Sequence, residues 1–208
     1  MRRLRAILRV GRLTGALCSA LLLPGWTGTQ AATPPAGQSP GHAGSGFTLS
    51  VPPGWKVDGN YAYRSFGPGH PIHGVLFHIP PELARGTNLS PDLTGISVES
   101  VPGPGRCEAS RFLPSPVKQR ALVENRTTYS VAEGHNAGAG NFYDEIVYAV
   151  VRSAPCIAVR YFIHSANIAN YDPGTVRAFD RPALIAEFDR IRRTLVLRPR
   201  APAPAAPR

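Results

Sequence analysis

Short stretches of alternating apolar and polar residues recur along the chain between positions 47 and 165. In the first, FTLSV at 47–51, Phe47, Leu49 and Val51 fall on one side and Thr48 and Ser50 on the other. A period of two is typical of a strand with one buried face. The same reasoning predicts further strands at 61–66, 74–80, 94–102, 126–134, 142–151 and 156–165.

The segments between these strands are rich in turn-forming residues. RSAP at 152–155 is short enough to join the last two strands as a hairpin. We expect loops at GTNLSPDLTG (86–95) and at the glycine-rich HNAGAGN (135–141). RCEASRFLP (106–114) is predicted to form a short helical turn that ends at Pro114.

The last element of the pattern is a helix. Asp180 suits the N-cap, and Pro182 is tolerated in the first turn. An apolar stripe follows at spacings of four, three and four, and it consists of Leu184, Phe188, Ile191 and Leu195. Hairpin-connected strands followed by an amphipathic helix predict the α+β class, a mainly antiparallel sheet with the C-terminal helix packed on one face.

Two sets of segments resemble known families. FTLSVPPGW (47–55) together with FDRIRRTLVL (188–197) resembles the PsbP-like fold family, which implies a small secreted or lumenal α/β sandwich. GTNLS, GAGN, YAVV and VRYFIHS…YDPG…FDR are similar to an uncharacterised family of secreted proteobacterial proteins, which implies export and the same fold. Neither resemblance supplies a catalytic residue, and PsbP-like proteins tend to be accessory or binding proteins.

The N-terminus has the order of an export signal. Five arginines in the first twelve residues precede an apolar run at 13–23, and small residues surround position 31. We therefore predict a signal peptide at 1–31, a flexible leader at 32–46, one domain at 47–197 and a disordered Ala/Pro/Arg tail at 198–208. Residues after Arg2-Arg3 fit the twin-arginine pattern poorly, which favours general export without deciding the route. The apolar run is too short for a membrane span in the mature chain.

The basic charge belongs to the ends of the chain. The net charge is +10, of which the first 31 residues carry five arginines and the tail three, so the domain keeps about +2. A nucleic-acid partner is therefore not expected. Abundant Arg, Ala, Gly and Pro indicate a bacterial chain, so the predicted location is periplasmic or secreted.

Two cysteines remain in the predicted mature chain, Cys107 and Cys156. An oxidising compartment favours a disulfide between them, while two free thiols or a redox pair are the alternatives. The two-residue spacing that redox pairs use is absent.

One candidate site lies on the 142–165 hairpin. If Arg152 pairs with Ile157, then Glu145 faces His164, and both share a sheet face with Arg160; a register shifted by two residues keeps this arrangement. Arg160 would bind an anion or carboxylate, and His164 would act as acid or base. The competing interpretation is a structural, solvent-facing ladder of charges, and it is the one we favour.

Other motifs are weaker. His70, His73 and His78 lie near each other in sequence but without a neighbouring carboxylate or Cys, so no metal and no cofactor is predicted. The expected function is non-enzymatic binding of an envelope protein or small ligand through a sheet face or the loops at 86–95 and 134–141. The alternative is a small hydrolase-like enzyme centred on the candidate cluster.

Overall fold

The computed structural model describes residues 46–198. The predicted signal peptide, most of the leader and most of the tail lie outside the described residues. The elements of the described part, in chain order, are β1 (Phe47–Thr48), β2 (Lys56–Asp58), β3 (Ala62–Tyr63), β4 (Ile72–His78), α1 (Pro81–Ala84), β5 (Gly95–Val101), η1 (Ala109–Phe112), β6 (Gln119–Glu124), β7 (Thr127–Gly138), β8 (Asn141–Val150), β9 (Cys156–Ala166), η2 (Ile168–Asn170), α2 (Arg181–Arg192) and β10 (Val196–Leu197).

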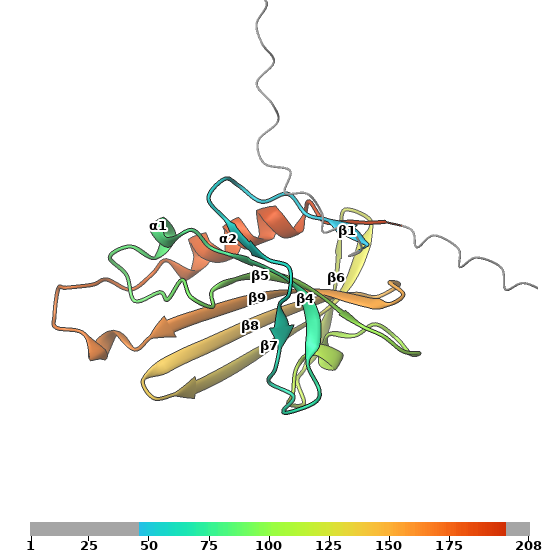
Figure 1. Cartoon of the computed structure of the whole chain (residues 1–208), viewed down its shortest axis with the longest axis horizontal. Coiled ribbons are helices and arrows are strands. Elements are labelled where there is room, and N and C mark those ends of the chain that lie inside the picture. Colours follow the sequence, from blue (N-terminus) through green and yellow to red (C-terminus); the bar gives the residue numbers. More distant parts are fainter. Residues whose placement is uncertain (1–45, 199–208) are drawn as a thin grey trace, which may run out of the picture. The chain divides into compact units, whose positions relative to one another are not determined.

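The main sheet is antiparallel throughout, as the alternating pattern predicted (Figure 1). Its strand order is β2-β4-β5-β9-β8-β7-β6, and β3 also pairs with β4. The ends of the domain form a separate two-stranded sheet in which Phe47 lies opposite Leu197. β9 is therefore a central strand, with β5 on one side and β8 on the other.

Both faces of the main sheet are covered. One face, on which Val159, Tyr161 and Ile163 lie, packs against Phe188 and Ile191 of α2 in the larger core. Asp180 caps α2, because its Oδ1 accepts a hydrogen bond from the Ala183 N–H at 2.9 Å. The second, smaller core on the opposite face is formed by η1, the segment around Cys107, and β3. In Figure 1, α2 and the η1 turn accordingly lie on opposite sides of the strands.

Two local predictions have the wrong extent. The glycine-rich stretch at 135–141 does contain the turn of a hairpin, but the loop is shorter than predicted, because β7 continues to Gly138 and only Ala139 and Gly140 form the turn. These two residues have φ of 48° and 76°, as a tight two-residue hairpin turn requires. The predicted strand at 61–66 shrinks to Ala62–Tyr63, and the edge strand β6 was not predicted at all.

Candidate functional site

The β8–β9 hairpin places the three predicted site residues on one face of the sheet. Its register is shifted by two residues from the predicted one, so Glu145 lies opposite Phe162 and His164 lies opposite Tyr143. Because side chains alternate with a period of two, this shift leaves Glu145, Arg160 and His164 on the same face. The structure nevertheless separates them into two hydrogen-bonded groups.

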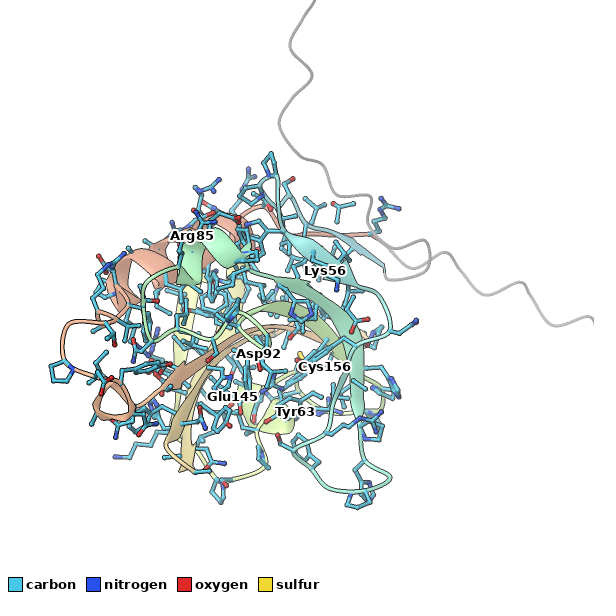
Figure 2. All side chains as sticks on the ribbon, turned by 60° about the vertical axis from the view of Figure 1, so that its left-hand side comes forward. Lys56, Tyr63, Arg85, Asp92, Glu145 and Cys156 are labelled. Atoms are coloured by element: carbon cyan, nitrogen blue, oxygen red, sulfur yellow. A yellow bond between two sulfur atoms is a disulfide. The ribbon has the colours of Figure 1, made fainter. Side chains whose placement is uncertain are left out.

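The first group surrounds the guanidinium of Arg160. It donates to both carboxylate oxygens of Glu99, at 2.7 Å from Nε and 2.8 Å from Nη2, and it donates to Glu145 from Nη1. Nη2 also donates to the carbonyl oxygen of Phe112 at 2.7 Å. The centroid of the Tyr63 ring lies 3.6 Å from the guanidinium carbon, and the Tyr63 hydroxyl donates to Glu145 at 3.0 Å. Figure 2 labels Tyr63 and Glu145, which lie near each other in that view. Four elements, β3, β5, η1 and β8, thus converge on the guanidinium that β9 carries.

This group is buried, so the expected solvent-facing ladder is wrong. The side chains of Arg160 and Glu99 have no exposed area, and that of Glu145 is 12% exposed. The reason is the second core, in which Tyr63 from β3 and Phe112 from η1 cover this face. A charge can be buried here because each nitrogen of the guanidinium has an acceptor.

Burial and charge act in opposite directions on these groups. Burial alone would lower the pKa of Arg160, but the adjacent carboxylates of Glu99 and Glu145 outweigh it and raise that pKa above its ordinary value. Burial raises the pKa of Tyr63 to about 12, although the positive charge of Arg160 opposes this shift. Arg160 therefore stays charged and Tyr63 stays neutral at physiological pH.

The second group surrounds His164. Its Nδ1 lies 3.0 Å from Oδ1 of Asp92, and its Nε2 lies 3.0 Å from Oδ1 of Asn141. The Asn141 amide is oriented by its own Nδ2, which donates to the Ala139 carbonyl at 3.1 Å. Both ring nitrogens of His164 thus face oxygen acceptors, and Tyr143 stacks on the ring at 4.7 Å between centroids. His164 joins the loop at 86–95 to the β7–β8 turn.

In the part of the chain that the structure describes, neither group lines any of the four pockets of 210–430 Å³ around Lys118, Phe179, His70 and Thr128. Every hydrogen-bonding nitrogen of Arg160 and of the His164 ring already has a partner within the protein. The arrangement can fix strands and loops in place, and it leaves these groups little capacity to bind a substrate.

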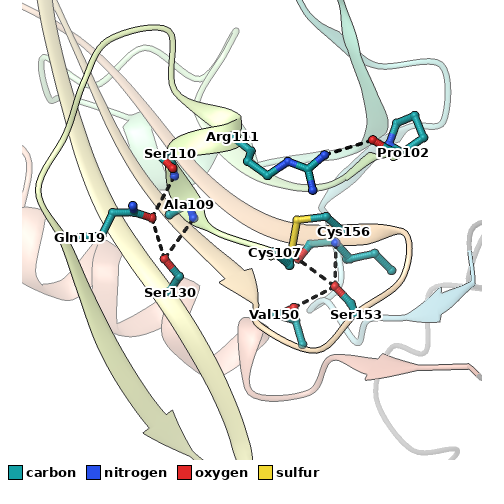
Figure 3. The surroundings of a disulfide bond; sticks show 11 residues. Pro102, Cys107, Ala109, Ser110, Arg111, Gln119, Ser130, Val150, Ser153 and Cys156 are labelled. Atoms are coloured by element: carbon teal, nitrogen blue, oxygen red, sulfur yellow. Dashed lines mark hydrogen bonds between the residues drawn. A yellow bond between two sulfur atoms is a disulfide. The ribbon is translucent and has the colours of Figure 1, made fainter. Parts of the chain in front are cut away.

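The predicted pair of cysteines forms a disulfide, which links Cys107 to Cys156 across 49 positions (Figure 3). It ties the segment before η1 to the first residue of β9. Ser153 supports the corner, because its hydroxyl accepts from the Ile157 N–H at 2.8 Å and donates to the Val150 carbonyl at 2.9 Å. The disulfide thereby attaches η1 and the segment before it, which cover the Arg160 group, to β9.

A second buried arginine was missed by the sequence analysis. Arg192 near the end of α2 is 1% exposed, and it contacts Glu124 at 2.8 Å, Asp189 at 3.1 Å and the hydroxyl of Tyr161 at 2.8 Å. Its guanidinium also lies over the ring of Tyr148 at 4.2 Å. The contact of Arg192 with Asp189 can be expected from the sequence, because the two residues lie three positions apart on one helix. The contact with Glu124 cannot, because Glu124 lies on β6, the strand that was not predicted.

The end of the sheet around His164 carries several exposed apolar side chains. Eight large apolar side chains are exposed within residues 46–198, and four of them come from segments that meet here: Leu93, Phe142, Ile168 and Tyr171. We call these four residues the tip surface; Phe142 projects from the sheet face opposite to that of His164, because neighbouring side chains of β8 alternate between the faces. The segments are joined by the His164 group and by Asn167, whose N–H donates to the Gly140 carbonyl at 2.8 Å.

His70, His73 and His78 do not gather into one site. His78 lies on β4 opposite Gly95, and His70 lies in the loop that precedes that strand. Within residues 46–198, no group of three or more His, Cys, Asp or Glu side chains is arranged to hold a metal ion.

No family model matches the chain, and neither a curated protein nor a solved structure shows significant similarity to it. In the part of the chain that the structure describes, no helix is long and apolar enough to cross a membrane.

Proposed function

We propose that this protein is an exported bacterial envelope protein that binds another envelope protein through the tip surface and catalyses no reaction. The observation that carries the proposal is the exposure of Leu93, Phe142, Ile168 and Tyr171 on segments held together by His164. Apolar side chains that remain exposed on a preorganised frame favour association, since little conformational freedom is lost on binding.

The disulfide supports the location. Disulfides persist in the periplasm and outside the cell and are rare in the cytosol. The Cys107–Cys156 bond is therefore compatible with an extracytoplasmic protein, as the arginine-rich N-terminus predicts.

The fold supports an accessory role of the PsbP-like kind. The two segments that carry that resemblance touch in space, because Trp55 packs edge-on against Phe188 with 5.9 Å between ring centroids, and Phe47 pairs with Leu197. We extend the proposal to a PsbP-like α/β sandwich on this contact. The hydrolase alternative gains no comparable support, since Glu145, Arg160 and His164 are already occupied by partners within the protein.

The proposal is tested by capture from envelope extract. Tagged wild-type protein, the variant Phe142→Ser/Ile168→Ser/Tyr171→Ser and a control variant Val123→Ser are each cross-linked in the extract, and captured proteins are quantified by mass spectrometry. Val123 is a matched control because its side chain is 71% exposed but lies on β6. We expect a protein that wild type and the control capture at least about tenfold more strongly than the tip variant does. Equal capture by all three proteins would contradict the proposal.

A further inference from the structure

Part of the outer edge of β7 has no neighbouring strand. The pairing of β6 with β7 ends at Gln119 opposite Ala132, whereas β7 runs on to Gly138 and pairs there with β8 alone. Figure 1 shows this distal part of β7 at the border of the sheet. An open strand edge presents backbone N–H and C=O groups that can pair with another chain.

The register shows which backbone groups point outward. The β7–β8 hairpin closes with a two-residue turn, so the flanking pair Gly138 and Asn141 is hydrogen-bonded across the hairpin. Pairs then alternate along the ladder, and Asn136 and Gly134 also bond towards β8. The N–H and C=O of His135 therefore point away from β8, to the side on which β6 pairs with the earlier part of β7 but does not reach His135. Among the described residues, neither of these two groups has a hydrogen-bond partner.

A pocket lies at the start of β6, where the pairing of Gln119 with Ala132 begins. It has a volume of about 430 Å³, and Lys118, Arg120 and Glu133 are its charged lining residues. Lys118 and Arg120 form no ion pair within residues 46–198, and Glu133 does not reach either of them. The pocket thus has an excess of positive charge at the end of the open edge.

The direction of an added strand relative to β7 decides which of its ends meets this pocket. A strand added antiparallel to β7 would continue the line of β6, starting beside Gly138 and ending beside Glu133. Its C-terminal end would therefore reach Lys118 and Arg120, where an acidic group gains Coulomb energy. Along the way it would pass Ala137, which lies opposite Phe142 of the tip surface.

We propose that the open edge of β7 at 133–138 binds an extended segment of the partner protein as an additional antiparallel strand, with an acidic residue at the segment's C-terminal end held by Lys118 and Arg120. This inference rests on the proposed function and specifies how the partner is held. Main-chain hydrogen bonds supply affinity in such complexes, and side-chain pockets supply specificity.

A pair of variants at one position tests the backbone contact. His135→Pro removes the outward N–H but no bond to β8, which is where an edge strand tolerates proline, whereas His135→Ala removes only the side chain and its contact with Asp144. The probe is a fluorescent peptide, acetyl-Thr-Val-Thr-Val-Thr-Asp-amide, titrated by anisotropy against the full chain. We expect the wild type and His135→Ala to bind it, and His135→Pro to bind at least about tenfold more weakly.

Charge reversal gives a second test that does not depend on proline. A peptide ending in Lys should bind the wild type about tenfold more weakly than the Asp peptide, and Lys118→Glu/Arg120→Glu should reverse this preference. Circular dichroism verifies that each variant is folded. The proposal is overturned if the wild type does not bind the Asp peptide at millimolar concentration, if His135→Pro binds as well as His135→Ala, or if the end residue makes no difference.

The envelope capture experiment separates this inference from the function on which it rests. If the tip variant loses a captured protein but His135→Pro retains it, the binding function stands and strand addition is wrong. If the peptide binds as described but the tip variant captures the same proteins as the wild type, the edge site stands and the tip surface is wrong.

Discussion

Replacing Arg160 with methionine should strongly destabilise the protein. The change leaves the carboxylates of Glu99 and Glu145 without a counter-ion in a region where the Glu99 side chain has no exposed area. It also removes the two hydrogen bonds to Glu99, the one to Glu145 and the one to the Phe112 carbonyl. Removing one partner of a buried ion pair costs about 3–5 kcal/mol, a large part of the roughly 5–15 kcal/mol by which a folded domain is stable.

Two further variants identify the cause of the loss. Adding Glu99→Gln and Glu145→Gln to Arg160→Met removes the stranded charges and should recover more than about 1 kcal/mol, because uncharged replacements of a whole ionic group are often nearly neutral. Arg160→Lys keeps the charge but cannot match both oxygens of Glu99, so an intermediate loss is expected. The surface control is Arg85→Met, whose ion pair with Glu82 is exposed on both sides and should change stability by less than about 0.5 kcal/mol.

The assay is urea unfolding with the disulfide intact, followed by tryptophan fluorescence and far-ultraviolet circular dichroism. The free energy of unfolding in water is compared among the variants at constant slope. A loss below about 1 kcal/mol for Arg160→Met, or a further loss on adding the two glutamines, would refute the reasoning that the stranded carboxylates dominate.

Three other predictions test the frame around the site. Cys107→Ser/Cys156→Ser should lower the free energy of unfolding by about 2–5 kcal/mol, because the bond closes a 49-position loop; denaturant unfolding measures it, and an unchanged midpoint would contradict it. Phe188→Ala should cost about 3–5 kcal/mol in the same assay, since Phe188 of α2 is fully buried against the sheet, and a loss under about 1 kcal/mol would speak against close packing there. Burial raises the pKa of Tyr63 to about 12, so the folded state keeps a proton that the unfolded state releases near pH 10. The free energy of unfolding should therefore fall between pH 10 and 12, and it should fall less steeply in Tyr63→Phe, as unfolding measured at several pH values will show.

The sequence was sufficient for features that depend on local periodicity. Alternation alone placed Val159, Tyr161 and Ile163 on a core face, and the structure confirms this. The same parity put Glu145 and Arg160 together, and this survives the difference in register because a shift of two residues preserves the faces.

Features that depend on distant segments were not predictable in this way. Glu99 is the principal partner of Arg160, but their meeting requires the pairing of β5 with β9, which are 61 positions apart at these residues and share no local signal. The burial of the cluster likewise depends on η1 and β3, which approach from elsewhere in the chain. An arginine in an apolar strand therefore resembles a solvent-facing residue until the covering segments are known.

The two-residue difference in register also shows what the buried ion pairs do for the sheet. Apolar alternation opposes slips by one residue, because such a slip would turn the core face of β9 towards the other side. It does not oppose slips by two, which is why the sequence alone gave a register displaced by two. Arg160 supplies the missing constraint: a slip of two residues would move its guanidinium about 6–7 Å from Glu99 on β5 and Glu145 on β8, leaving three buried charges unpaired. The cluster therefore fixes β9 against both neighbours, and with it the position of His164 at the tip of the sheet.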